Sequence, residues 1–145
     1  MASPRCSCQV GKSTLVRRFA AQSGMTLHEV NLERQPHLGA AFASMDVCRI
    51  LAEVELVVRK GPVTGAGGLL FLYEIQAIPA AIAALHYLYE EVPKLPVIAA
   101  GSLLEFALEN TRFSMPVGRI AYLFMGPMTG FRLRAGLILS QGRPR

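Results

Sequence analysis

Aspartate is almost absent from this sequence of 145 residues: of its ten acidic residues only Asp46 is an aspartate, and the others are glutamates. A mechanism that needs an aspartate therefore has one candidate. Long apolar runs are also missing. No stretch of 18 uncharged apolar residues is present, so we expect no membrane-spanning helix. Residues 1–10 contain no apolar stretch of the length that a secretory signal needs.

Cysteine is scarce, and its spacing is typical of neither a disulfide framework nor a zinc site. The number of cysteines is odd, and no two of them form a CxxC pair: they are Cys6, Cys8 and Cys48. We interpret them as free thiols and expect a cytoplasmic protein. The alternative is a metal site that uses Cys6, Cys8 and a histidine, but two ligands one residue apart are weak evidence for it.

The net charge of +5 is unevenly distributed. Residues 1–109 contain nine basic and ten acidic residues, whereas residues 110–145 contain six arginines and no acid. Nucleic-acid binding through these arginines is one hypothesis, although the segment contains no motif that reads bases. The chain is 52% hydrophobic with a mean hydropathy of +0.35, which excludes a disordered chain. Its length suits a single domain.

Apolar spacing predicts helices that alternate with short apolar strands. The predicted helices cover residues 12–22, 47–58, 79–92 and 103–109. The predicted strands cover residues 25–31, 69–72, 96–100 and 119–125. This alternation predicts an α/β fold with a parallel sheet.

The strongest local motif is Gln9-Val10-Gly11-Lys12-Ser13-Thr14, which leads directly into the first predicted helix. It matches the second half of a phosphate-binding P-loop, GxxxxGK[ST]. Lys12 is predicted to neutralise nucleotide phosphates, and the Ser13 hydroxyl to coordinate Mg²⁺. Cys6 stands where the first glycine is required. The alternative is a solvated lysine at the start of a helix.

A second motif follows the apolar run Leu69–Leu72, which resembles a Walker-B strand. The next position normally holds the aspartate associated with Mg²⁺, and here it is Tyr73. The position after it suits a glutamate that orients the attacking water, and Glu74 fits. A phenol is neutral near pH 7 and cannot supply the missing charge. The alternative for Glu74 is an ordinary loop carboxylate.

Together these motifs resemble bacterial and archaeal AAA-type ATP-binding proteins. The resemblance spans about residues 9–129, and its motifs appear in the order of that family. They are Gln9–Thr14, Asn31-Leu32-Glu33, Phe71-Leu72-x-Glu74-Ile75-Gln76, Pro96–Glu105, Met115–Arg119 and Gly126–Thr129.

The resemblance implies a P-loop NTPase domain with a three-layer fold and a mainly parallel sheet, which uses ATP and Mg²⁺. Ser102 then resembles the polar sensor near the γ-phosphate, with a simple helix cap as the alternative. Arg119 resembles an arginine finger or sensor that acts on the charge of the transition state. A solvated cation at a strand edge is the alternative for Arg119.

The sequence also departs from that family. Cys6 replaces the first P-loop glycine, Cys8 an arginine, and Tyr73 the Walker-B aspartate. Residues 1–7 lack the apolar strand that the resemblance places before the P-loop, in the middle of the sheet. In that family a C-terminal domain with nuclease-like relatives follows the ATPase domain, and we expect it to be absent here. We therefore expect a partial AAA-type domain over residues 1–129 and an unmatched basic tail over 130–145, a truncated copy whose tail is read from a shifted frame.

Two functions follow from these observations. The first is a nucleotide-binding domain in which hydrolysis is impaired or absent, because both Walker motifs are altered. The second is a non-catalytic pseudo-ATPase fragment that acts as a protein-interaction module, because a sheet without its first strand exposes an edge that another chain can pair with. A homo-oligomer or a partner chain is compatible with either function.

Overall fold

The computed structural model describes residues 11–101, 120–125 and 135–140, the last two ranges through their backbone. The helices are α1 (Lys12–Gln22), α2 (Leu38–Ala43), α3 (Val47–Val58) and α4 (Pro79–Glu91), with a short helix η1 (Ile75–Ala77). The strands are β1 (Thr26–Asn31), β2 (Gly68–Tyr73), β3 (Val97–Gly101), β4 (Ile120–Met125) and β5 (Ala135–Ser140). Within these ranges no helix is long and apolar enough to cross a membrane.

The predicted elements agree closely with the observed ones over residues 11–101. The bounds of α1 and α3 are those predicted, and α4 ends one residue earlier than expected. All four predicted strands are present as β1 to β4. Three elements were not predicted: α2, the short helix η1 and β5. The predicted helix over 103–109 lies outside the described residues.

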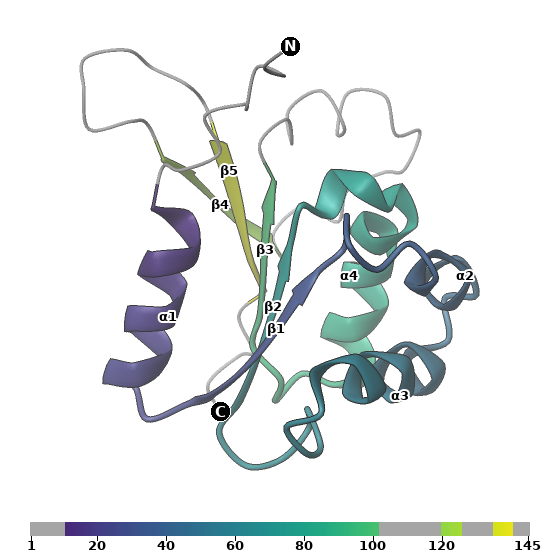
Figure 1. Ribbon diagram of the computed structural model, residues 1–145, viewed down its shortest axis with the longest axis horizontal. Coiled ribbons are helices and arrows are strands. Elements are labelled where there is room, and N and C mark those ends of the chain that lie inside the picture. The colour runs from purple at the N-terminus through teal and green to yellow at the C-terminus, as the bar shows by residue number, and fades with distance from the viewer. Residues whose placement is uncertain (1–10, 102–119, 126–134, 141–145) are drawn as a thin grey trace, which may run out of the picture.

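The described strands form one sheet in the order β1-β2-β3-β5-β4 (Figure 1). β1 pairs with β2 and β2 with β3 in parallel, whereas β5 is antiparallel to both β3 and β4. β4 therefore runs in the same direction as β1, β2 and β3, and β5 alone runs against them. The sheet is mainly parallel in strand direction, as predicted.

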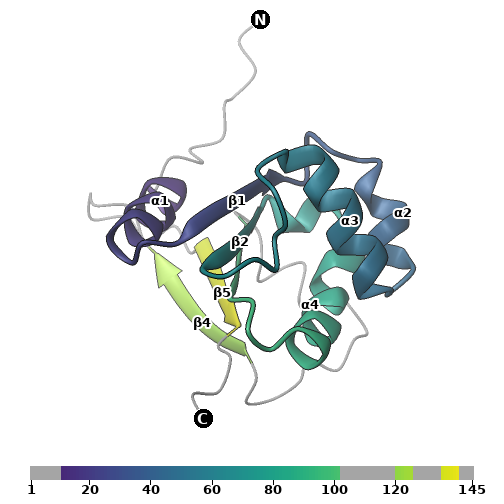
Figure 2. The same ribbon diagram turned by 90° about the horizontal axis from the view of Figure 1, so that it is seen from below.

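Helices cover both faces of this sheet. α1 lies on one face, and α2, α3 and α4 lie on the other (Figures 1 and 2). Because side chains alternate along a strand, β2 supplies both cores. Its Leu69 and Phe71 pack in the cluster of α1, and its Leu70 and Leu72 pack in the cluster of α2, α3 and α4. This arrangement confirms the three-layer α/β fold.

The single aspartate of the chain has a structural position. Asp46 is the N-cap of α3, and its Oδ1 accepts a hydrogen bond from the backbone N–H of Arg49 at 3.3 Å. Such a cap satisfies one of the N–H groups that the first helical turn leaves without a partner. Asp46 is thus committed to the helix end and is not available for a site at the end of β2.

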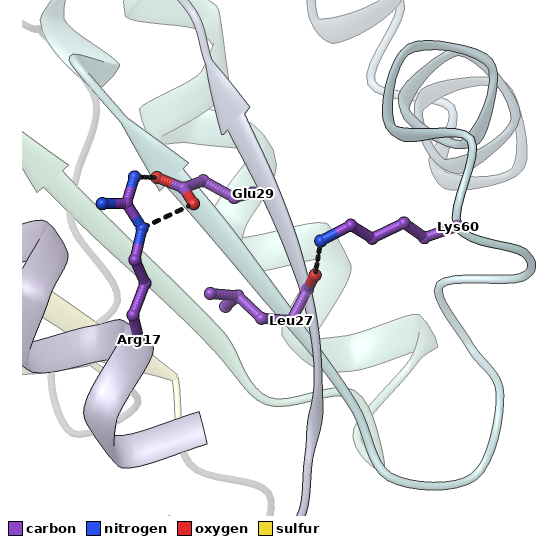
Figure 3. A network of polar contacts seen from close by, with 4 residues as sticks. All are labelled: Arg17, Leu27, Glu29 and Lys60. Atoms are coloured by element: carbon purple, nitrogen blue, oxygen red, sulfur yellow. Dashed lines mark hydrogen bonds and ion pairs between the residues drawn. The ribbon is translucent and has the colours of Figure 1, made fainter. Parts of the chain in front are cut away.

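Polar side chains lie on both sides of the edge strand β1 (Figure 3). Arg17 of α1 donates two hydrogen bonds to the carboxylate of Glu29, at 3.0 and 2.6 Å, which ties α1 to the strand. Lys60 donates from Nζ to the carbonyl oxygen of Leu27 at 3.4 Å. Charged side chains at a sheet edge discourage pairing with another chain. Arg17, Glu29 and Lys60 therefore disfavour pairing of β1 with another chain, and their contacts also fix α1 and the segment after α3 beside the strand.

Gly68, the first residue of β2, is a position where any side chain meets backbone. A Cβ at this residue would lie 2.2 Å from the carbonyl oxygen of Val63. We predict that Gly68→Ala lowers the free energy of unfolding by about 1–3 kcal/mol, the usual effect of overpacking. The measurement is the midpoint of urea unfolding.

Gly39 of α2 provides the matched control, since a Cβ there meets nothing within 4 Å. Because alanine suits a helix interior better than glycine, Gly39→Ala should stabilise the chain slightly. A Gly68→Ala variant as stable as the parent would show that the loop before β2 moves freely.

Candidate functional site

The candidate site lies at the edge of the sheet where β1, β2 and β3 end. Asn31, the last residue of β1, is in register with Tyr73, and Tyr73 with Ala100 of β3. The N-terminus of α1 lies at the same edge (Figure 1). Ligands of open α/β sheets bind outside the carboxyl ends of the strands, so the predicted motifs meet where this fold class binds its ligands.

Gly11 and Lys12 form the start of α1. Gly11 is the N-cap in the left-handed conformation, with φ 75°, which glycine adopts without the penalty of a Cβ. No side chain caps the helix, and its first turn contains no acidic residue. The N–H groups of the first turn and the helix dipole are therefore suited to an anion.

Lys12 is 6% exposed although it carries an ammonium group. Within the described part of the chain the ion pairs are Arg17–Glu29 and His86–Glu90, and neither involves Lys12. Burying a charge without a counter-charge is costly. The position of Lys12 is thus one that a bound anion would stabilise.

Ser13 and Thr14 follow in the first turn, where Ser13 is half-buried and Thr14 is exposed. A hydroxyl is a suitable ligand for Mg²⁺, which usually binds in proteins through one or two protein oxygens together with phosphate oxygens and water. No group of three or more histidine, cysteine, aspartate or glutamate side chains that could hold a metal is present among the described residues.

Tyr73 lies on the α1 face of β2, as the Walker-B interpretation requires. Its half-buried ring packs against the cluster that contains Val16 and Ala20 of α1. The ring also stacks on Phe71, with centroids 5.4 Å apart and planes 25° from parallel. The position beside α1 at the end of β2 is consequently filled by an aromatic ring.

Glu74 is held in an unusual backbone conformation. Its φ of 56° is left-handed, which a residue other than glycine or asparagine seldom adopts. Such strain is often found at functional sites. The Oε2 of Glu74 accepts a hydrogen bond of 2.6 Å from Nε2 of Gln76. The carboxylate is therefore oriented by a neighbour two residues along the chain.

Gly101, the last residue of β3, makes room for this pair. A Cβ at Gly101 would lie 2.5 Å from Oε1 of Gln76. Gln76 and Gly101 both lie in the motifs that carry the family resemblance, but no pattern in the sequence connects them. Only the parallel pairing of β2 with β3 shows that the end of β3 adjoins η1.

Asn31 is another residue whose contribution sequence reasoning missed. Its Oδ1 accepts hydrogen bonds from the backbone N–H groups of Glu33 and Arg34, at 3.0 and 3.2 Å. This turn directs the chain away from the site as β1 ends. An asparagine directly after an alternating apolar strand is the signal that could have predicted the turn.

Several predicted site residues are not placed by the structure. Gln9, Val10, Ser102 and Arg119 lie outside the described residues, as do Cys6 and Cys8. Of the predicted set, the structure brings Gly11, Lys12, Ser13, Thr14 and Glu74 to one edge of the sheet. Their roles at that edge remain predictions.

His28 is buried away from this edge, on the face of β1 opposite α1. It is 1% exposed, and its Nδ1 has no hydrogen-bond partner among the residues that the structure describes. Burial is the main cause that lowers the pKa of His28 below its ordinary value of 6.5. The charge of Lys60 lowers the pKa further, and the charge of Glu55 acts in the opposite direction. His28 is therefore favoured in its neutral form.

This pKa shift predicts a fold that weakens in mild acid. Below pH 6.5, the ordinary pKa, the unfolded chain takes up a proton that the folded chain does not. The free energy of unfolding should therefore decrease as the pH falls through 6.5 and stop decreasing once the lower folded pKa is passed. Urea unfolding between pH 8 and pH 5 measures this. His28→Leu should remove that part of the pH dependence, whereas His37→Leu, at an exposed position, should keep it.

Comparison with known proteins identifies the family. A family model described as an AAA domain matches residues 7–131, most of the chain. No curated protein and no solved structure matches it. The matched range contains the P-loop helix α1, the three parallel strands and the candidate site at their carboxyl ends. The chain therefore belongs to the AAA domain family and is a nucleotide-binding domain of the AAA type.

Proposed function

We propose that this chain binds ATP at the carboxyl edge of β1, β2 and β3, and that it hydrolyses ATP slowly or not at all. The observation that carries the proposal is Lys12, a buried ammonium without a carboxylate partner in the described residues, at the open N-terminus of α1. Phosphate oxygens would supply the missing counter-charge and accept hydrogen bonds from the N–H groups of the first turn.

A Mg²⁺ ion bound with the nucleotide would have one protein ligand, the hydroxyl of Ser13. Ser13 would hold Mg²⁺ together with phosphate oxygens and water. When bound, the metal neutralises phosphate charge and so favours attack on the terminal phosphorus. Glu74 would accept a hydrogen bond from the attacking water at Oε1, while Gln76 holds Oε2. The proposed catalytic contributions of Ser102 and Arg119 rest on the family resemblance.

Two replacements are expected to weaken the site, one at the step of hydrolysis and one at the step of binding. Tyr73 stands at the position that should stabilise the metal electrostatically, and its neutral ring is packed against Phe71 and the α1 cluster. Cys6 adds a Cβ where the loop needs a glycine. Hydrolysis depends more than binding does on charge placed for the transition state. The loss of the aspartate should therefore harm turnover more than affinity, and Cys6 should weaken affinity itself.

The test is isothermal titration of the full chain with ATP and Mg²⁺, combined with an assay of phosphate release. We expect weak, saturable binding and little release of phosphate. The same titration with adenosine, which lacks phosphates, is the control and should give no saturable heat. Absence of binding to ATP would refute the nucleotide site, whereas rapid turnover would refute the view that Tyr73 disables hydrolysis.

A further inference from the structure

The connections in the sheet determine where a strand that leads into α1 must lie. The chain passes from β1 to β2 and from β2 to β3 with its helices on one face, whereas α1 lies on the other face. Connections between parallel strands are nearly always right-handed. The connections from β1 to β3 move across the sheet in one direction with their helices on one face. A right-handed connection that contains α1, on the other face, must therefore move in the opposite direction, from the β3 side of the sheet toward β1.

That position is the one beside β3. β2 and β3 occupy the first two places next to β1, so a strand that enters α1 and runs parallel to β1 falls in the next place. The structure has β5 there. β5 comes from the other end of the sequence and runs antiparallel to β3, in the opposite direction to the strand that the connection into α1 requires.

β5 is paired on both sides. Its residues are in register with β3 from Gly101↔Gly136 to Val97↔Ser140, and with β4 from Met125↔Ala135 to Ile120↔Ser140. The segment Ala135-Gly136-Leu137-Ile138-Leu139-Ser140 is uncharged, and its three central residues suit a buried strand. Among the described strands β4 pairs with β5 alone, so β5 also attaches β4 to the rest of the sheet.

We propose that β5 is a substitute strand, because residues 135–140 fill the position beside β3 where a strand entering α1 would lie. An apolar strand that is parallel to β3 and connected to α1 would displace them. The position beside β3 is thus a strand-binding site, and β5 occupies it in this structure. The partner class that it accepts is an extended apolar segment. This inference does not depend on nucleotide binding.

A disulfide reports whether β5 is in place. Ala99 and Ile138 are in register across β3 and β5. In a chain whose three native cysteines are replaced by serine, Ala99→Cys with Ile138→Cys should form an intramolecular disulfide. Val97→Cys with Leu137→Cys is the matched control. In this register these positions are three residues apart along the strands, roughly 10 Å, which is too far for a disulfide.

The displacement experiment uses the same reporter. Residues 1–5 are replaced by Leu-Val-Ile-Val-Val, which provides an apolar strand directly before the P-loop. A control replacement, Leu-Val-Pro-Val-Val, contains a proline that a central strand does not tolerate. We expect the first replacement to lower the yield of the Ala99–Ile138 disulfide at least tenfold, and the control to leave it unchanged. An undiminished yield with a folded first variant would overturn the proposal.

A second measurement uses the unmodified chain and decides the matter if the extended variant does not fold. A displaceable strand opens without global unfolding, so its amides exchange with solvent through a lower-energy opening. Hydrogen exchange should be at least tenfold faster for the paired amides of β5 than for those of β2. Equal protection of β5 and β2 would overturn the proposal, as would a disulfide that forms only between two copies.

Discussion

Replacing Lys12 by alanine is expected to weaken ATP binding by about ten- to a hundredfold, because a hydrogen bond to a charged group contributes about 1.5–3 kcal/mol. The structure explains why the loss should be large. Lys12 is shielded from water at the start of α1, where the N–H groups of the first turn are suited to the same phosphates. Isothermal titration with ATP and Mg²⁺ measures the change.

The same helix provides the control for this prediction. Arg18 is exposed on α1, nearly two helical turns after Lys12, so Arg18→Ala removes one positive charge without removing a buried partner of the phosphates. Its effect on affinity should be small and should disappear in high salt. Equal losses for Lys12→Ala and Arg18→Ala would show that the phosphates respond only to overall charge.

Replacing Tyr73 by aspartate is expected to increase phosphate release at least tenfold, since one electrostatic group at a transition state commonly contributes about 10²–10³ in rate. Tyr73 ends β2 on the face of α1, so a carboxylate there would lie on the same side of the sheet as Ser13 in the first turn of α1. Combining Tyr73→Asp with Cys6→Gly should also strengthen binding.

Tyr73→Phe separates the effect of charge from that of the ring. It keeps the stacking on Phe71 and adds no charge, so phosphate release should stay at the parent level. Thermal unfolding of each variant shows whether loss of the ring weakens the α1 cluster. If a folded Tyr73→Asp chain released phosphate no faster than the parent, the aspartate would not be what hydrolysis lacks.

The sequence predicted the parallel half of the fold well, because its signals there are strong and local. α1 starts after a glycine, α3 after an aspartate that caps it, and α4 at Pro79, and each start was predicted within one residue. Leu69–Leu72 and residues 96–100 are uncharged apolar runs of strand length. Buried parallel strands have such continuous apolar sequences because both of their faces are covered.

The sequence predicted candidate site residues but not their contacts. The motif spacing selected Lys12, Ser13 and Glu74 as candidates, since phosphate chemistry requires those residue types, and their roles stay predictions. The hydrogen bond from Gln76 to Glu74, the space that Gly101 provides and the stacking of Tyr73 on Phe71 arise from strand pairing and backbone conformation. None of these leaves a pattern in the sequence.

β5 was missed for a different reason. Its six residues lie within a segment rich in arginine and contain a glycine, which is unfavourable in a strand. Ala135–Ser140 is a strand because it pairs with β3, which ends more than thirty residues earlier in the chain, and with the nearer β4. The α2 helix was missed because six residues are too few to show a helical period.

The order of strands in the sheet also has a consequence during synthesis on the ribosome. β3 is complete at Gly101, but its neighbour on one side, β5, begins only at Ala135. At ordinary translation speeds roughly 2–7 s separate the two. Through that interval the backbone groups on one side of β3 have no sheet partner, and such an edge can pair with other chains. A chaperone that shields extended apolar segments would therefore be needed most in those seconds, before the last strand joins the sheet.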